Sequence, residues 1–92
     1  MMYATKIRMC PGCSSSYDCK NIEAIYLKGA QSEQYYAKAA LYDWLIANPY
    51  TIRVNLGNMP YVIPARSSNG EKYVRSEPND TIYDNLLYLP RG

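Results

Sequence analysis

Histidine and phenylalanine are absent from this chain of 92 residues, and tryptophan occurs only once. Without histidine the chain cannot form a Ser-His-Asp or Cys-His catalytic pair, an HExxH zinc site, a Cys₂His₂ finger or an imidazole pH switch. Many enzyme mechanisms are thereby excluded, and we expect a protein that is not an enzyme. The aromatic content is instead carried by eleven tyrosines.

Charge and hydrophobic content are both modest. Ten Lys/Arg against eight Asp/Glu give a net charge of +2, which is too small to imply general affinity for nucleic acids. No run approaches the roughly 18 apolar residues of a membrane span, and residues 1–8 become charged too early for a signal peptide. The length and composition predict a single globular domain over residues 1–92 without membrane contact, and without an export signal we expect it in the cytoplasm.

A period-two alternation of side chains predicts five strands. These are residues 3–9, 21–28, 50–56, 61–63 and 72–75. In the first strand the alternation places Lys6 and Arg8 on one face, and Tyr3, Thr5 and Ile7 on the other. Asn-Gly at positions 69–70 favours a two-residue hairpin turn between the last two strands.

One helix is predicted over residues 33–47, because apolar side chains recur there at helical spacing. Ser32 is the expected N-cap, and Asn-Pro at positions 48–49 ends the helix. The element order β-β-α-β-β-β predicts an α+β fold, with a four- to five-stranded antiparallel sheet covered on one face by this helix. Beyond Pro78, we expect Asp80 or Thr81 to cap a short helical turn.

Three cysteines, Cys10, Cys13 and Cys19, lie close together in the sequence. An odd number of cysteines favours a reducing compartment over a disulfide framework. The CxxC spacing allows both sulfurs to bind one metal with Cys19 as a third ligand, but a closed zinc site needs four ligands, and Asp18 is the remaining candidate. Zinc binding, redox chemistry and incidental loop cysteines all remain open, and no other cofactor is expected.

Basic residues and tyrosines alternate along the predicted strands. Asn-Gly at the hairpin is expected to place Arg66 opposite Tyr73, with Arg75 on the same face as Tyr73. Such a stripe suits a nucleic-acid backbone or an acidic protein surface, whereas the alternative is a solvated face with Glu23 and Glu71 interspersed. The candidate binding residues are Lys6, Arg8, Lys28, Arg53, Arg66, Tyr73 and Arg75.

Residues 73–90 read YVRSEPNDTIYDNLLYLP. This segment resembles the closing pattern Y-(V/L)-(R/K)-(S/T)-x-P-(N/D)-x-T-x-x-D-N-L-x-x-L-P of a family of small bacterial and phage proteins of unknown function. The resemblance implies the same layout of strands and one helix, and it implies no activity. The cysteine loop is not part of the pattern.

A small, tyrosine-rich chain without histidine is also similar in kind to phage-encoded inhibitors of the type I-F CRISPR surveillance complex, which act by binding. The resulting hypothesis is a small binding protein that sterically blocks a host ribonucleoprotein and its access to target DNA. Its expected partner is a protein or ribonucleoprotein with guide RNA in the cytoplasm of the host cell, and no small-molecule substrate is expected. The alternatives are a free-standing nucleic-acid-binding module and a metal-stabilised interaction module.

Overall fold

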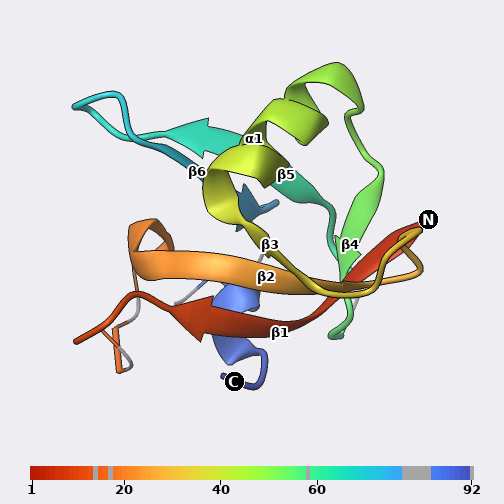
Figure 1. Cartoon of the computed structure of the whole chain (residues 1–92), viewed down its shortest axis with the longest axis horizontal. Helices are drawn as coiled ribbons and strands as arrows, with labels where there is room; N and C mark the ends of the chain where they lie inside the picture. Colours follow the sequence, from red (N-terminus) through yellow and green to blue (C-terminus); the bar gives the residue numbers. More distant parts are fainter. Residues whose placement is uncertain (14, 17, 58, 78–83, 92) are drawn as a thin grey trace.

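The computed structural model describes residues 1–13, 15–16, 18–57, 59–77 and 84–91 (Figure 1). Within them the chain forms strands, one α-helix and two short 3-10 helices. In chain order these are β1 (Met2–Met9), η1 (Cys19–Asn21), β2 (Ile22–Lys28), β3 (Tyr35–Ala37), α1 (Lys38–Ala47), β4 (Ile52–Val54), β5 (Val62–Arg66), β6 (Lys72–Ser76) and η2 (Asn85–Tyr88).

The strands are divided between a four-stranded sheet of order β3-β2-β1-β4 and a separate hairpin of β5 and β6. Strands β1, β2 and β3 pair antiparallel, but β4 pairs with β1 in parallel because α1 carries the chain from one edge of the sheet to the other. The α+β class and the covering helix are confirmed. The sheet is mixed rather than antiparallel, and a bridge between Arg53 and Tyr61 links it to the chain that enters the hairpin.

Strand β1 contains a β-bulge at Thr5. Ala4 pairs with Leu27 and Lys6 pairs with Tyr26, so Thr5 has no partner across the ladder. A bulge inserts one residue and reverses the alternation of faces beyond it. Ala4 and the distal Ile7 are therefore both buried. The placement of Lys6 and Arg8 together on the exposed face is confirmed, whereas the placement of Tyr3 on the same face as Ile7 is wrong because the bulge lies between them.

Helix α1 begins five residues later than predicted. Residues 35–37 pair with β2 as strand β3, and the helix starts after Ala37, whose side chain provides no cap. The predicted N-cap at Ser32 is therefore wrong, because pairing with β2 outweighs the local helical pattern. The end is as predicted, since the Asn48 backbone N–H donates to the Trp44 carbonyl at 2.7 Å.

The hydrophobic core lies between the inner face of the sheet, α1, the hairpin and η2. It consists of Ala4, Ile7, Met9, Ile22, Ile25, Leu27, Leu41, Leu45, Ile52, Val54, Val62, Val74, Leu86, Leu87 and Leu89. The 3-10 helix η2 is capped by Asp84, which accepts a hydrogen bond from the Leu86 N–H at 3.0 Å. The predicted cap at Asp80 or Thr81 lies outside the described residues.

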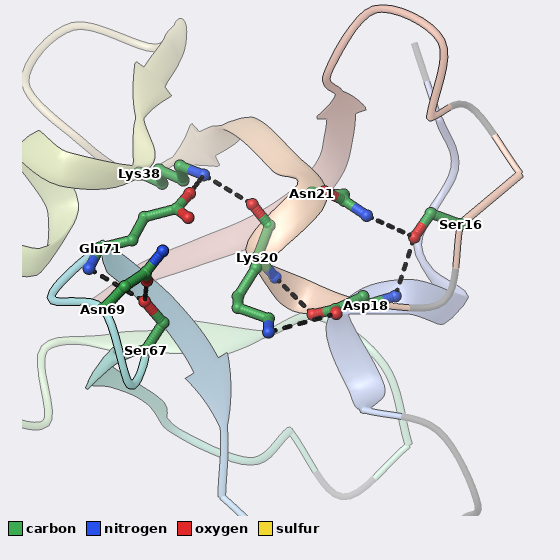
Figure 2. A network of polar contacts seen from close by, with 8 residues as sticks. All are labelled: Ser16, Asp18, Lys20, Asn21, Lys38, Ser67, Asn69 and Glu71. Carbon is green, nitrogen blue, oxygen red and sulfur yellow. Dashed lines mark hydrogen bonds and ion pairs between the residues drawn. The ribbon is translucent and has the colours of Figure 1, made fainter.

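A polar network joins three segments at one side of the molecule (Figure 2). Lys38, at the start of α1, donates to the Lys20 carbonyl at 2.6 Å and pairs with the Glu71 carboxylate at the hairpin turn. Asp18 caps η1 by accepting the Lys20 N–H at 2.9 Å. The hairpin tip and the entry to β2 are thus both fastened to the helix.

The turn after β2 packs against the first residue of the chain, and this contact can be tested. Gly29 has a φ of 82°, and a Cβ there would lie 2.8 Å from the Met1 carbonyl oxygen. Gly70 has a similar φ of 86°, with open space around a Cβ. An alanine at either site costs about 1–2 kcal/mol of backbone strain, and only Gly29→Ala adds a clash. Urea denaturation should show a larger loss of unfolding free energy for Gly29→Ala than for Gly70→Ala. Equal losses would contradict the packing of residue 1 against this turn.

Candidate binding surface

The outer face of the sheet, which points away from the core, carries basic and tyrosine side chains in rows. Residues directly paired across a ladder share a face. Lys6 pairs with Tyr26, and Tyr26 pairs with Tyr35, which forms one row. Arg8 pairs with Ala24, which lies on the same face as Tyr26. Three strands therefore bring together side chains that are up to 29 positions apart in the sequence.

Cations and rings are in direct contact on this face. The Lys6 Nζ lies 4.6 Å from the Tyr26 ring centroid, and the Arg8 Cζ lies 4.2 Å from the Tyr35 ring centroid. The two rings meet edge to face with their centroids 5.3 Å apart. Contacts of this kind contribute about 0.5–1 kcal/mol each at exposed sites. We call these four residues the tyrosine–cation face.

A second row on the same side of the sheet extends this surface. Tyr3 pairs with Lys28 on one side and with Arg53 on the other. The Arg53 Cζ lies 4.3 Å from the Tyr61 ring centroid, and one of its nitrogens donates to the Tyr61 hydroxyl at 2.8 Å. Lys28 is exposed, whereas Arg53 is half-buried. Positive charge thus continues from the tyrosine–cation face toward β4.

Carboxylates neutralise cations elsewhere on the molecule. Among the described residues the ion pairs are Lys20–Asp18, Lys38–Glu71, Lys72–Asp43 and Arg75–Asp84. Within the part of the chain that the structure describes, Lys6, Arg8 and Lys28 have no carboxylate within ion-pair distance. The net charge of +2 therefore understates the local positive potential of the outer face.

The hairpin residues of the predicted stripe do not lie on this face. Arg66 pairs with Lys72, and Tyr73 pairs with Ala65, so Arg66 and Tyr73 lie on opposite faces of the hairpin. The register differs from the prediction because the turn spans residues 67–71, closed by the Ser67 N–H donating to the Glu71 carbonyl at 2.9 Å.

The prediction that basic residues and tyrosines of the sheet and the hairpin form one continuous stripe is therefore wrong. Arg66 lies beside Tyr42 of α1, with its Cζ 5.6 Å from the ring centroid. Arg75 shares a face with Tyr73, as predicted, but it faces Asp84 at 3.9 Å. Lys6, Arg8, Lys28 and Arg53 are the predicted binding residues that the fold brings to one side.

Sequence reasoning did not include Tyr26 and Tyr35 among the candidate binding residues. Tyr35 was expected within the helix, where it has no relation to Arg8. The adjacent tyrosines at 35 and 36 are a signal for a strand, because aromatic residues favour strands. Their pairing with β2 is a tertiary contact that the local pattern does not contain.

The three cysteines are free and half-buried. Among the described residues no group of three or more Cys, Asp or Glu side chains is positioned to hold a metal ion. Cys19 instead packs against the core and faces Asp84. Burial, with the negative charge of Asp84 as the second cause, raises the pKa of the Cys19 thiol to about 12. The zinc alternative thus finds no three-ligand group among the described residues, and Cys19 is engaged with Asp84.

Asp84 and Asn85 of the C-terminal pattern have structural roles. The Asp84 carboxylate accepts the Ser76 N–H at 3.0 and 3.1 Å. Asn85 donates through Nδ2 to the Ser76 hydroxyl at 3.0 Å. Ser76 and Asn85 are both buried. This part of the pattern joins β6 to η2 through satisfied buried polar groups, which is a role in folding.

A separate cavity of about 310 Å³ lies between α1 and the inner side of β2 and β3. Its lining is mostly apolar and consists of Met2, Leu27, Ala30, Gln31, Tyr36, Ala40, Leu41 and Trp44. Trp44 is 44% exposed, and its Nε1 donates to the Thr51 hydroxyl at 2.9 Å. No lining residue is charged, so the cavity and the outer face are chemically distinct.

Among the described residues no helix has the length and apolar content needed to cross a bilayer.

The Cys19 thiol predicts how stability depends on pH. Its pKa is raised from 9.0 to about 12, so the folded state holds a proton that the unfolded state releases above pH 9. Its contribution to stability is complete below pH 9 and is lost as the pH rises toward 12. Wild type should lose unfolding free energy more steeply than Cys19→Ser between pH 9 and 10.5, by at most ~1.4 kcal/mol per pH unit. Parallel curves from urea denaturation would contradict the buried thiol.

Comparison with known proteins is informative about family alone. Residues 4–90 match the family model described as "Protein of unknown function (DUF3892)". No curated protein matches the chain, and no solved structure does. The expectation of a domain family without a known activity is confirmed, and the match extends far beyond the C-terminal segment on which that expectation rested. The match covers nearly the whole chain, and the chain therefore belongs to the DUF3892 family.

Proposed function

We propose that this chain is a non-catalytic binding protein whose tyrosine–cation face binds single-stranded nucleic acid. The observation that carries the proposal is that Lys6 and Arg8 rest on tyrosine rings without a carboxylate partner among the described residues. Proteins that bind single strands combine a basic surface that follows the backbone with aromatic side chains that contact bases. The outer face of the sheet offers both.

The geometry favours phosphate as the immediate ligand of the cations. An arginine guanidinium can donate two parallel hydrogen bonds to one phosphate, and Arg8 lies over the Tyr35 ring with its Cζ 4.2 Å from the ring centroid. Since the rings already hold both cations, binding costs less side-chain entropy than it would for free lysine and arginine side chains. Lys28, in the adjacent row, supplies a further positive charge.

The same face of the sheet also offers aromatic rings that bases could contact. Tyr26 and Tyr35 lie edge to face, and Tyr3 lies in the next row of the sheet. Stacking of a base on an aromatic side chain contributes about 1–3 kcal/mol. Some RNA-binding modules likewise present their stacking aromatic residues on the face of a sheet.

A narrower form of the proposal concerns the source of the strand. The strand would be the guide RNA of a host ribonucleoprotein, and the bound chain would block access to target DNA, as phage-encoded inhibitors of type I-F CRISPR complexes do. The support for this form is the chain's small size, its tyrosine content and the absence of histidine. Affinity purification from a host lysate tests it. Co-purification of a ribonucleoprotein, together with protection of phage in a plaque assay, is the expected result. Purification of the chain alone and no protection would reject this form while leaving direct strand binding intact.

Direct binding can be tested with a 20-nucleotide oligouridine and oligothymidine by fluorescence anisotropy. The double variant Lys6→Gln/Arg8→Gln should bind at least about tenfold more weakly than wild type. Because about 0.7 counterions are released per phosphate contact on a single strand, losing two contacts should lower the slope of log affinity against log salt by about 1.4.

The matched control is Lys20→Gln/Lys72→Gln, which removes the same charge from exposed side chains that form surface ion pairs elsewhere. Such pairs contribute little to stability, so this variant should fold and bind nearly as wild type does. Equal weakening by both double variants would show that net charge, rather than this face, attracts the strand. An absence of binding at low salt would overturn the proposal, and binding of an acidic protein in its place would reassign the face.

A further inference from the structure

The CxxC segment forms a tight turn that the proposed binding function does not use. The Cys13 N–H donates to the Cys10 carbonyl at 2.9 Å, and Gly12 has a φ of 79°. Proline at the second position and a left-handed glycine at the third are the signature of a type II turn. The ends of a β-turn lie within about 7 Å between Cα atoms, which matches the separation that a disulfide requires.

Hydrogen bonds hold this turn in place. The Cys10 N–H donates to the Asn21 carbonyl at 2.8 Å, which continues the pairing of β1 and β2 beyond Met9. The Cys13 carbonyl accepts the Ser16 N–H at 3.0 Å. Both cysteines are free and half-exposed, so a small thiol reagent can reach them. The turn thus holds the backbones of the two cysteines near each other, at the end of the central strand.

We propose that Cys10 and Cys13 form a redox-active dithiol that closes to an intramolecular disulfide by exchange with a low-molecular-weight disulfide such as oxidised glutathione. One cysteine thiolate attacks a sulfur of oxidised glutathione, forms a mixed disulfide and releases one glutathione thiolate. The second cysteine thiolate attacks the protein sulfur of the mixed disulfide and releases the second glutathione. Two protein thiols are oxidised and one glutathione disulfide is reduced to two thiols, so electrons and protons balance.

Cys19 provides an internal contrast. It is packed against the core and hydrogen-bonded to Asp84. Burial raises its pKa to about 12, so it stays protonated near neutral pH, and the thiolate is the form that attacks disulfides. The proposed dithiol therefore consists of Cys10 and Cys13, and Cys19 takes no part in the exchange.

The test equilibrates reduced, folded protein without oxygen in buffers ranging from reduced to oxidised glutathione. Remaining thiols are then blocked with iodoacetamide under denaturing conditions, and the peptides are mapped by mass spectrometry. We expect oxidation to remove two alkylation sites, both within residues 10–13, with a loss of two hydrogens. Cys19 should be alkylated throughout the series. The variant Cys10→Ser should instead accumulate a glutathione adduct on Cys13, because the second exchange step lacks its attacking thiol.

Cys19→Ser, the matched control, should oxidise at the same ratio of reduced to oxidised glutathione as wild type. If that variant does not fold, the peptide map of wild type still decides the question. Three alkylated cysteines across the whole series, or a disulfide that includes Cys19, would overturn the proposal. Because oligonucleotide binding is measured separately on reduced protein, failure of the dithiol and failure of the proposed binding function are distinguishable.

Discussion

The β-bulge at Thr5 is the constraint on which the two faces of the sheet depend. Strand β1 pairs with β2 on one side, and with β4 and Arg91 on the other, so its alternation decides what the neighbouring strands bury. Ala4 and Ile7 are three residues apart and would face opposite ways in a regular strand. The bulge lets both enter the core, and it turns Lys6 outward beside Tyr26.

The two ends of the chain then serve different purposes. The C-terminal end closes the fold, since Asp84 and Asn85 satisfy the backbone and side chain of Ser76 and position η2 against the core. The first three strands carry the tyrosines and cations that the fold does not use to bury apolar surface. Among the described residues, carboxylates pair with Lys20, Lys38, Lys72 and Arg75, whereas Lys6, Arg8 and Lys28 on the outer face have no such partner.

The spacing of apolar residues along the chain predicts the features that neighbouring residues determine. The α+β class, the end of the helix at residue 47, and the outward direction of Lys6 and Arg8 are all evident from the sequence. The start of the helix is not, because the pairing of residues 35–37 with β2 outweighs a helical pattern. The hairpin register differs by one residue through the hydrogen bonds of its turn, and that shift moves Arg66 to the other face. The alternation within β1 is enough to place Lys6 and Arg8 on one face. The positions of Tyr26 and Tyr35 beside them depend on the order of the strands in the sheet.

The most direct measurement is a titration of isotope-labelled protein with oligouridine, followed by NMR chemical shifts. If the outer face of the sheet is the binding surface, the largest changes will occur at Lys6, Arg8, Tyr26 and Tyr35, and they will diminish as salt is added. Changes concentrated around Trp44 and the apolar cavity, or on the hairpin at Arg66, would contradict the assignment of this face.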